Sequence, residues 1–404
     1  MSLARKEAFA RFDSKLQIEY IKGRPSRNLS NYYSLFSVGS DQVWCARYMR
    51  DPGWYFLRFA PRSKRVALCP SIGVASVSND DARLLRRGLA GFDELSVREE
   101  DGAALIRELT GREATVLVDP TLMLTAEEWR DVADGRLTPA EPYVFAYILG
   151  KEDPARDALI ARLAAGRQVI RISDRDDGTE LPAGPAEFID LVDHAALVVT
   201  DSFHGSVFAT LLATPLVEVP RAGGEHMAGR IDTLVSKLGL ARVPVGEGDA
   251  LAVPEGVPGG EGALVDASAG KKPADVAAPA EDAEAPAAPN VGAPATAAAP
   301  AAAAPAAPAE MTQGGASPTA ASRADWLVPT PSTPELLAAE RRKFASYLAG
   351  VLDSRGYPEQ AARARAAWGV SSDDARAEGA GAAAGAAAAG TEGPHERLPR
   401  EELR

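Results

Sequence analysis

The sequence contains few cysteines and no apolar run long enough to cross a membrane. Among its 404 residues only Cys45 and Cys69 are cysteines, and their spacing is not that of a CxxC pair. Two such cysteines fit a reducing compartment better than a disulfide scaffold. The N-terminus lacks the apolar stretch of a secretion signal, and no apolar run reaches the ~20 residues of a membrane helix. We therefore expect a cytoplasmic protein without a transmembrane segment.

Positive charge and histidine are also scarce. The formal net charge is −12, there are four histidines, and no run is rich in lysine or arginine. Because nucleic acids attract clustered positive charge, we expect no nucleic-acid partner. The two cysteines and His204 are not spaced as metal ligands, so we expect neither a metal nor a cofactor.

Large apolar residues are missing from two long segments. Residues 246–330 consist mainly of Ala, Pro, Gly and Glu, and residues 356–404 include the run AEGAGAAAGAAAAG. Such segments bury too little apolar surface to offset the entropy of ordering the chain. We predict a disordered insertion at 246–330 and a largely disordered tail at 356–404. The amphipathic stretch between them, 331–355, is predicted to form a helix that packs on the folded body, which occupies residues 14–245.

That body alternates short apolar strands with helices. Runs such as Tyr143–Leu149 and Leu197–Thr200 end in polar turns and are followed by segments with helical apolar spacing. Trp54–Phe59 is interpreted as a further extended segment. The alternation is typical of parallel sheets covered by helices, so the predicted fold class is α/β. A loop-like stretch divides it into an N-terminal domain, residues 1–135, and a C-terminal domain, residues 136–245.

The segment LVVTDSFHGSVFATLLATP, residues 197–215, is the most informative in the chain. An apolar strand leads through Ser202 and His204 into a second apolar run with helical spacing. Helix N-termini offer unpaired backbone N–H groups and the positive end of the helix dipole. The Ser202 hydroxyl and the backbone nitrogens that follow it, including that of Gly205, are therefore candidates for binding an anion. Ser202 alternatively serves only as the N-cap.

Six segments of distinctive sequence follow one another along the chain. They are VGSDQVW (38–44), KRVALCPSIG (64–73), FDELSVRE (92–99), VLVDPTLMLTAEEW (116–129), the segment GPAEFIDLVDHAALVVTDSFHG that begins at residue 184, and RIDTLVSKLGL (230–240). In order and spacing they resemble the polysaccharide pyruvyl transferases. The resemblance implies two Rossmann-like domains arranged as in GT-B glycosyltransferases, with the active site between them. It also implies transfer of a pyruvyl group from phosphoenolpyruvate to two hydroxyls of a sugar, which releases phosphate. The acceptor would be a cell-surface saccharide or a lipid-linked precursor, with peripheral membrane association through that acceptor.

The candidate residues suit this chemistry. Arg98 has a planar guanidinium that can bind a carboxylate or phosphate, and the resemblance places a donor-binding arginine at its SVRE position. His204 is the candidate general acid, and we predict that it becomes protonated when the anionic donor binds. Arg230 begins the RIDTL segment and would supply a second positive charge. Ser40 and Asp41 follow the first strand, and Asp41 is either a base for a sugar hydroxyl or a cap of its turn.

Two other residues are assigned structural roles from the sequence. Asp119, before Pro120, is interpreted as a turn residue, and His194 as a helix cap. Family members normally begin with a further strand and helix, and this chain starts at about the segment that follows that unit. A late start codon, a truncation that needs a partner, or a degenerate copy would each explain this. The chain is then either an active enzyme or a non-catalytic binding module that retains the donor pocket. A nucleotide-sugar glycosyltransferase is the third reading.

Overall fold

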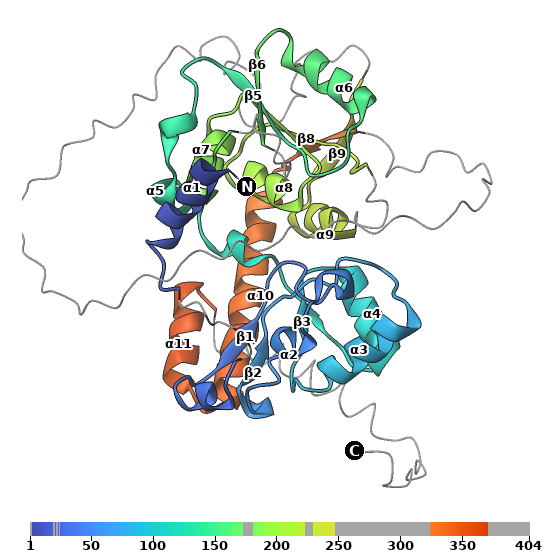
Figure 1. The fold of residues 1–404 in the computed structure, drawn as a ribbon, viewed down its shortest axis with the longest axis vertical. Coiled ribbons are helices and arrows are strands. Elements are labelled where there is room, and N and C mark those ends of the chain that lie inside the picture. Colours follow the sequence, from blue (N-terminus) through green and yellow to red (C-terminus); the bar gives the residue numbers. More distant parts are fainter. Residues whose placement is uncertain are drawn as a thin grey trace, which may run out of the picture.

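The structure, a computed structural model, describes residues 2–18, 21, 23, 25–172, 181–222, 229–246 and 324–370. It is a mixed α/β fold in which two halves lie one above the other (Figure 1). We define the first half as residues 36–123 and the second half as residues 143–246 together with residues 325–328. Most of the predicted insertion, and the predicted tail beyond residue 370, lie outside the described residues.

A six-stranded sheet forms the centre of the second half, in the order β6-β5-β7-β8-β10-β9. Its strands are β5 (Tyr143–Tyr147), β6 (Gln168–Ile172), β7 (Leu197–Thr200), β8 (Leu216–Glu218), β9 (Ala241–Pro244) and β10 (Asp325–Val328). The first four are parallel, as the sequence pattern predicts, whereas β10 is antiparallel to both β8 and β9. The side chains of β5 alternate between the two sheet faces. Tyr143 and Phe145 join the core that includes residues of α7, α8 and α9, and Val144 and Ala146 join the core that includes α6.

Two short pairs of parallel strands form the first half. β1 (Phe36–Val38) pairs with β2 (Arg65–Ala67), and β3 (Ser96–Val97) pairs with β4 (Thr115–Val116). The Ser96 side chain links the pairs, because its Oγ accepts from the Cys69 backbone N at 2.9 Å and donates to the Ala67 carbonyl at 2.7 Å. The two pairs are therefore held next to each other through Ser96.

Eleven α-helices lie within the described part of the chain. They are α1 (Leu3–Asp13), α2 (Pro52–Tyr55), α3 (Asn79–Leu89), α4 (Glu100–Thr110), α5 (Ala126–Val132), α6 (Pro154–Ala164), α7 (Pro185–Asp193), α8 (Phe203–Leu211), α9 (Gly229–Leu238), α10 (Thr333–Ser354) and α11 (Pro358–Ala367). None of the helices among the described residues is long and apolar enough to span a bilayer.

Two predicted boundaries at the C-terminal end are wrong. β10 lies inside the stretch predicted to be disordered as far as residue 330, and its Trp326 is fully buried. α11 lies inside the stretch predicted to be a largely disordered tail from residue 356, and it packs against α10. Both segments lie next to stretches with few large apolar residues. Each packs against apolar residues from another part of the chain, which the local composition does not reveal.

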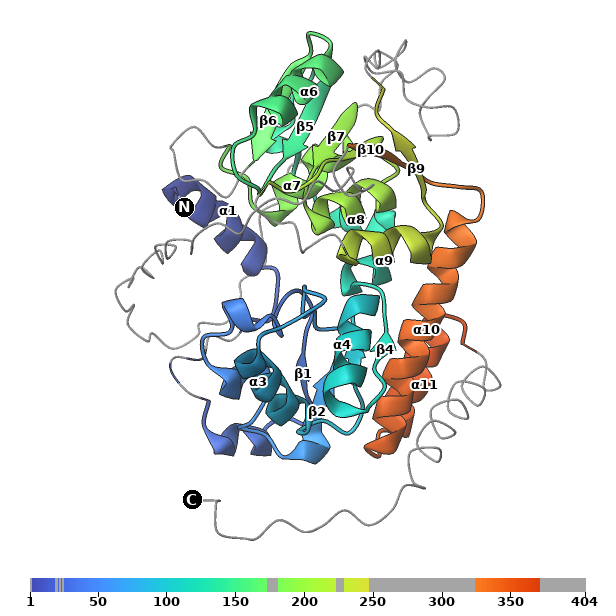
Figure 2. The ribbon, with the colours of Figure 1, turned by 90° about the vertical axis from the view of Figure 1, so that its right-hand side faces the viewer.

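Helix α10 runs beside both halves, as Figure 2 shows. On the second half, its Glu340 pairs with Lys237 of α9 at 3.0 Å. On the first half, its Tyr347 hydroxyl donates to the Ala67 carbonyl at 2.9 Å. Arg355, just after the helix, pairs with Glu94 at 2.6 Å. The helix therefore holds the two halves against each other.

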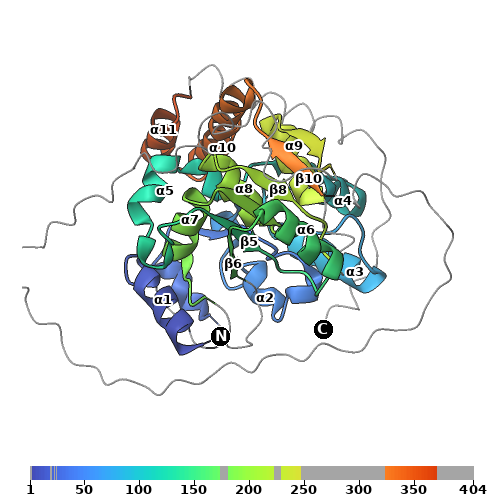
Figure 3. The ribbon, with the colours of Figure 1, turned by 90° about the horizontal axis from the view of Figure 1, so that it is seen from above.

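Two sequence predictions for the N-terminal part are also wrong. α1 precedes residue 14, where the folded body was predicted to begin, and it packs on α7, as seen from above in Figure 3. Arg11 of α1 pairs with the buried Glu187 of α7 at 2.7 Å. The interpretation of Trp54–Phe59 as extended is also wrong, because α2 ends at Tyr55. Asp51 caps that helix through the Gly53 N–H, and Pro52 occupies its first position, which is a helix-start pattern.

His194 gives a prediction for stability against pH. It is the C-cap of α7, as the sequence predicts, and hydrogen bonding to Asp190 raises its pKa from 6.5 to about 8. Because the pKa is higher in the folded state, the stabilisation is complete below pH 6.5 and is lost as the pH rises through about 8. Nearly half of the side chain is exposed, so His194→Gln should cost less than ~1 kcal/mol at pH 6 and nothing at pH 9. Urea unfolding of both proteins at the two pH values measures this. An equal loss at pH 6 and pH 9 would contradict it.

Candidate functional site

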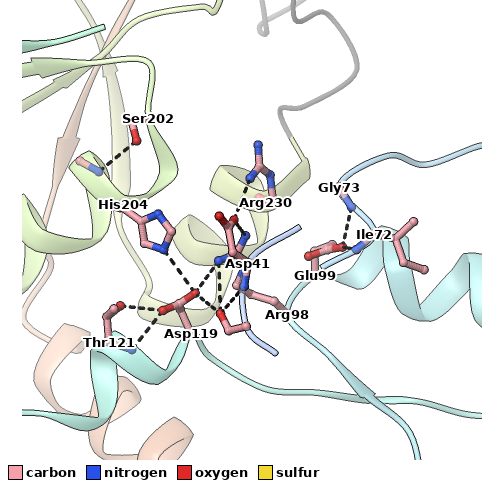
Figure 4. Close-up of polar contacts among 12 residues, drawn as sticks. Asp41, Ile72, Gly73, Arg98, Glu99, Asp119, Thr121, Ser202, His204 and Arg230 are labelled. Atoms are coloured by element: carbon pink, nitrogen blue, oxygen red, sulfur yellow. Dashed lines mark hydrogen bonds and ion pairs between the residues drawn. The ribbon is translucent and has the colours of Figure 1, made fainter. Parts of the chain in front are cut away.

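The candidate site lies where the carboxyl ends of parallel strands from the two halves meet (Figure 4). In open α/β sheets ligands bind at this end of the strands. Each polar residue follows a strand within a few positions: Ser40 and Asp41 follow β1, Arg98 follows β3, Asp119 follows β4, and Ser202 and His204 follow β7. Arg230 comes from the first turn of α9. The structure therefore brings Ser40, Asp41, Arg98, His204 and Arg230, all predicted from the sequence, close to one another.

Asp119 is the hub of these contacts. Its side chain is 2% exposed, and its Oδ2 accepts from Arg98 Nη1 at 2.5 Å and from the Ser40 hydroxyl at 2.8 Å. His204 Nε2 lies 3.7 Å from the same oxygen. Burial acts to raise the pKa of Asp119, but the nearby His204 side chain and the charge of Arg98 outweigh it and hold the pKa well below its usual range. Asp119 is thus a buried, ionised carboxylate that connects the two halves.

The sequence interpretation of Asp119 is right about the turn and wrong in leaving the residue out of the site. Its Oδ1 accepts from the Thr121 backbone N at 3.0 Å and the Thr121 hydroxyl at 2.8 Å, so it does cap the turn at Pro120–Met123. The other carboxylate oxygen is left for Arg98 and Ser40. The signal that finds this role is position, because Asp119 follows a buried strand as the other site residues do.

Arg98 is enclosed by partners. Its side chain is 1% exposed, and Nη2 donates to Asp41 Oδ1 at 3.0 Å while Nη1 donates to Asp119. Its guanidinium lies 4.3 Å from the ring centre of Phe203, at the start of α8 in the second half. Burial acts to lower the pKa of Arg98, but the charge of Asp119 outweighs it and raises the pKa. Arg98 is therefore a fixed cation, and only the side covered by Asp41 faces outward.

Arg230 is a buried cation whose charge is only weakly offset by nearby carboxylates. Its side chain is 8% exposed, and among the described residues Asp41 is the only carboxylate within 4.0 Å of its guanidinium, at that distance from Nη1. Burial, followed by the charge of Arg98, lowers the pKa of Arg230 to about 10. The guanidinium stays charged at neutral pH. A desolvated cation without a close partner is suited to bind an anionic ligand.

The start of α8 is built as a capped helix. Ser202 is buried and its Oγ accepts from the Gly205 N–H at 3.4 Å, so the predicted N-cap role is confirmed and the predicted anion donor at Gly205 is already engaged. Gly205 also lets the side chain of Thr200 pass close to the helix, because a Cβ at this position would collide with it. His204, by contrast, keeps 35% of its side chain exposed and faces Asp119.

A family model described as polysaccharide pyruvyl transferase matches residues 5–219. The chain belongs to the polysaccharide pyruvyl transferase family. It is accordingly a transferase enzyme whose family implies a pyruvyl donor and a saccharide acceptor. Comparison with curated proteins found no match. Comparison with solved structures found none either.

Two further residues of this pyruvyl transferase were missed from the sequence. Glu99, next to Arg98, is buried and accepts from the backbone nitrogens of Ile72 and Gly73 at 2.8 and 3.0 Å, so it fixes the loop that follows β2. Phe203, beside His204, stacks its ring against the Arg98 guanidinium. Neither role has a local sequence signal, because in both cases the partner comes from another part of the chain.

Within the part of the chain that the structure describes, no group of three or more His, Cys, Asp and Glu side chains is placed to hold a metal ion. Cys45 and Cys69 are both buried and free. His226, which the sequence places on a glycine-rich loop as a candidate for contact with the acceptor, lies outside the described residues.

Proposed function

We propose that the chain transfers the pyruvyl group of phosphoenolpyruvate to two hydroxyls of one saccharide residue, forming a cyclic ketal and releasing phosphate. The observation that carries the proposal is the grouping of Arg98, Arg230 and His204 at the meeting of the two halves. Phosphoenolpyruvate brings a carboxylate and a phosphate, and such groups are bound by fixed arginines. The family match supports a pyruvyl donor, and the arginines favour this anionic one.

The two halves are proposed to correspond to two Rossmann-like domains in a GT-B-like arrangement. Parallel strands in each half and a site at their carboxyl ends support this assignment. We further propose that the reaction takes place in the cytoplasm, on a saccharide or a lipid-linked saccharide. An acceptor of the second kind would bring the enzyme to a membrane surface without a spanning helix.

The reaction proceeds in two proton-balanced steps. In the first, one sugar oxygen bonds to C2 of the donor, its proton goes to a carboxylate, and the C2=C3 electron pair takes a proton from His204 to form the methyl group. In the second, the other sugar oxygen bonds to C2, its proton goes to His204, and the C2–O bond to phosphate breaks. The carboxylate then returns its proton to the departing phosphate, and both groups are restored. Asp41 is the exposed carboxylate of the site and takes this role.

The assay that tests the proposal is release of phosphate from phosphoenolpyruvate. The full chain is supplied with the donor and a panel of methyl glycosides that carry neighbouring or 4,6-paired hydroxyls, and the ketal is detected by mass. We expect phosphate release that depends on one of these acceptors. Turnover of a nucleotide sugar, with none of phosphoenolpyruvate, would overturn the proposal in favour of a glycosyltransferase. Donor binding without turnover of any acceptor would favour a non-catalytic binding module.

Arg230→Gln should weaken donor binding without unfolding the protein. A hydrogen bond to a charged group contributes about 1.5–3 kcal/mol, which corresponds to a loss of ~10- to 100-fold in affinity. Isothermal titration with phosphoenolpyruvate measures this. Arg107→Gln is the matched control, because Arg107 is exposed and pairs with Glu113 at the last turn of α4, at the end opposite to Arg98. Equal affinities of the Arg230 variant and the control would show that Arg230 does not contact the donor.

A further inference from the structure

The two terminal nitrogens of the Arg98 guanidinium are held by two carboxylates, one exposed to solvent and one buried. The inner partner, Asp119, is 2% exposed and is fixed by Ser40 and Thr121 as well as by Arg98. The outer partner, Asp41, has a side chain that is 62% exposed, and its contact with Nη2 is 3.0 Å. An ion pair whose carboxylate is open to solvent can be replaced by a competing anion, whereas the inner pair cannot.

The same Asp41 oxygen also serves the second arginine. Oδ1 lies 4.0 Å from Arg230 Nη1, so a single carboxylate oxygen stands between two arginines, one from each half. Figure 4 shows Asp41 between Arg98 and Arg230, and His204 next to Asp119. Two guanidinium groups thus converge on one carboxylate oxygen. Asp41 therefore takes the position that an anionic group of a ligand would take.

The backbone at Asp41 is fixed while its side chain is not. Asp41 has φ +49, in the left-handed region, which is unusual for a residue with a side chain. Its carbonyl accepts from the backbone nitrogens of Val43 at 2.8 Å and Ser71 at 2.7 Å, and its own N–H donates to the Ser40 hydroxyl at 2.6 Å. Displacement of the carboxylate from the arginines thus requires only rotation of the side chain. The loop need not move.

We propose that Asp41 is a resident occupant of the donor site, which phosphoenolpyruvate displaces from Arg98 and Arg230. The displaced carboxylate then becomes the base for the acceptor hydroxyl. This inference rests on the proposed function. It adds an order to the reaction, because the base is released only when the donor is in place.

The electrostatics of Asp41 support this sequence. Burial acts to raise its pKa, but the charge of Arg98 outweighs it and lowers the pKa, with His204 and Arg230 contributing. A carboxylate held in this way is a weak base. When the anionic donor takes over the two arginines, the pKa of Asp41 moves back up, and its affinity for the hydroxyl proton increases.

The test is a pair of measurements on Asp41→Asn, which keeps the size of the side chain and removes its charge. Because the resident anion no longer competes, we expect phosphoenolpyruvate, and inorganic phosphate as a second probe, to bind about tenfold more tightly than to the wild type. Turnover should at the same time fall by ~10²- to 10⁴-fold, the usual effect of losing a general base. An ordinary binding residue would lose affinity on substitution, so a rise in affinity with a fall in turnover is specific to this role.

Asp101→Asn separates displacement from a general change in charge. Asp101 lies on α4 against Gly229, the residue before Arg230, and no ion pair of 4.0 Å or less joins it to another described residue. We expect its donor affinity to stay within about twofold of the wild type. If Asp41→Asn binds the donor no more tightly than the wild type, or Asp101→Asn gains as much, the inference is overturned while wild-type turnover leaves the proposed function standing. If the wild type neither binds nor converts phosphoenolpyruvate, both are overturned.

Discussion

His204→Ala should lower the rate of phosphate release by ~10³-fold while the protein remains folded. Loss of a positioned general acid costs 10²- to 10⁴-fold. The His204 ring is partly exposed, and its Nε2 faces the site, 3.7 Å from Asp119 Oδ2. The measurement is steady-state phosphate release under saturating donor. Since His204 contributes mainly to the chemical step, donor affinity should change much less than turnover.

His194→Ala is the control for this substitution. His194 also lies at a helix end and beside an aspartate, but it belongs to α7. Its side chain contacts Asp190, which is not a site residue. Its activity should match the wild type. A His204→Ala protein that retains more than about a tenth of the activity would remove His204 from the proton transfer, because even a weak general acid contributes more than that.

Asp119→Ala should destabilise the protein by about 3–5 kcal/mol, since it leaves the Arg98 guanidinium buried without its inner partner. Urea unfolding measures the free energy. Glu113→Ala is the control: it also breaks an ion pair with an arginine, but both side chains of that pair are exposed, so the unfolding midpoint should hardly move.

A double-mutant cycle shows whether the loss comes from the unpaired charge. Asp119→Ala combined with Arg98→Met removes both charges and replaces the guanidinium by an apolar chain of similar length. The double variant should be more stable than the sum of the two single effects predicts, because no buried charge is left unpaired. Strict additivity would mean that Asp119 stabilises the fold through contacts other than the one with Arg98, such as those with Thr121 and Ser40.

The site residues differ in how far the sequence can reveal them. His204, Arg98 and Arg230 stand directly after a strand or at a helix start within segments of recognisable order, so strand-end chemistry and resemblance together single them out. Asp119 also follows a strand within a few positions. The Asp-Pro pattern, however, is already explained by a local turn, so it does not indicate a site residue. The second role of Asp119 depends on Arg98 and Ser40, which are distant in sequence, and no local pattern encodes such contacts.

The limits of sequence prediction for the fold have the same cause. β5 and β7 are predicted because each is an apolar run that stands out from its surroundings and ends in a polar turn. β10 is not, because its four residues follow a long Ala/Pro-rich stretch and become a strand only between β8 and β9. The reverse error occurs at Trp54–Phe59, where aromatic composition favours a strand but Asp51 and Pro52 start a helix.

The position of β10 determines when the second half can be completed as the chain is made. β9 has no neighbour in its sheet other than β10, and β8 has β10 along its outer edge. A nascent chain that ends before β10 therefore lacks the strand that pairs with both β8 and β9, and an unpaired sheet edge favours aggregation. The ribosome must synthesise the whole of residues 247–323 before that edge closes, and α10 follows only then. The contacts that α10 makes with both halves are in this sense formed late in biosynthesis.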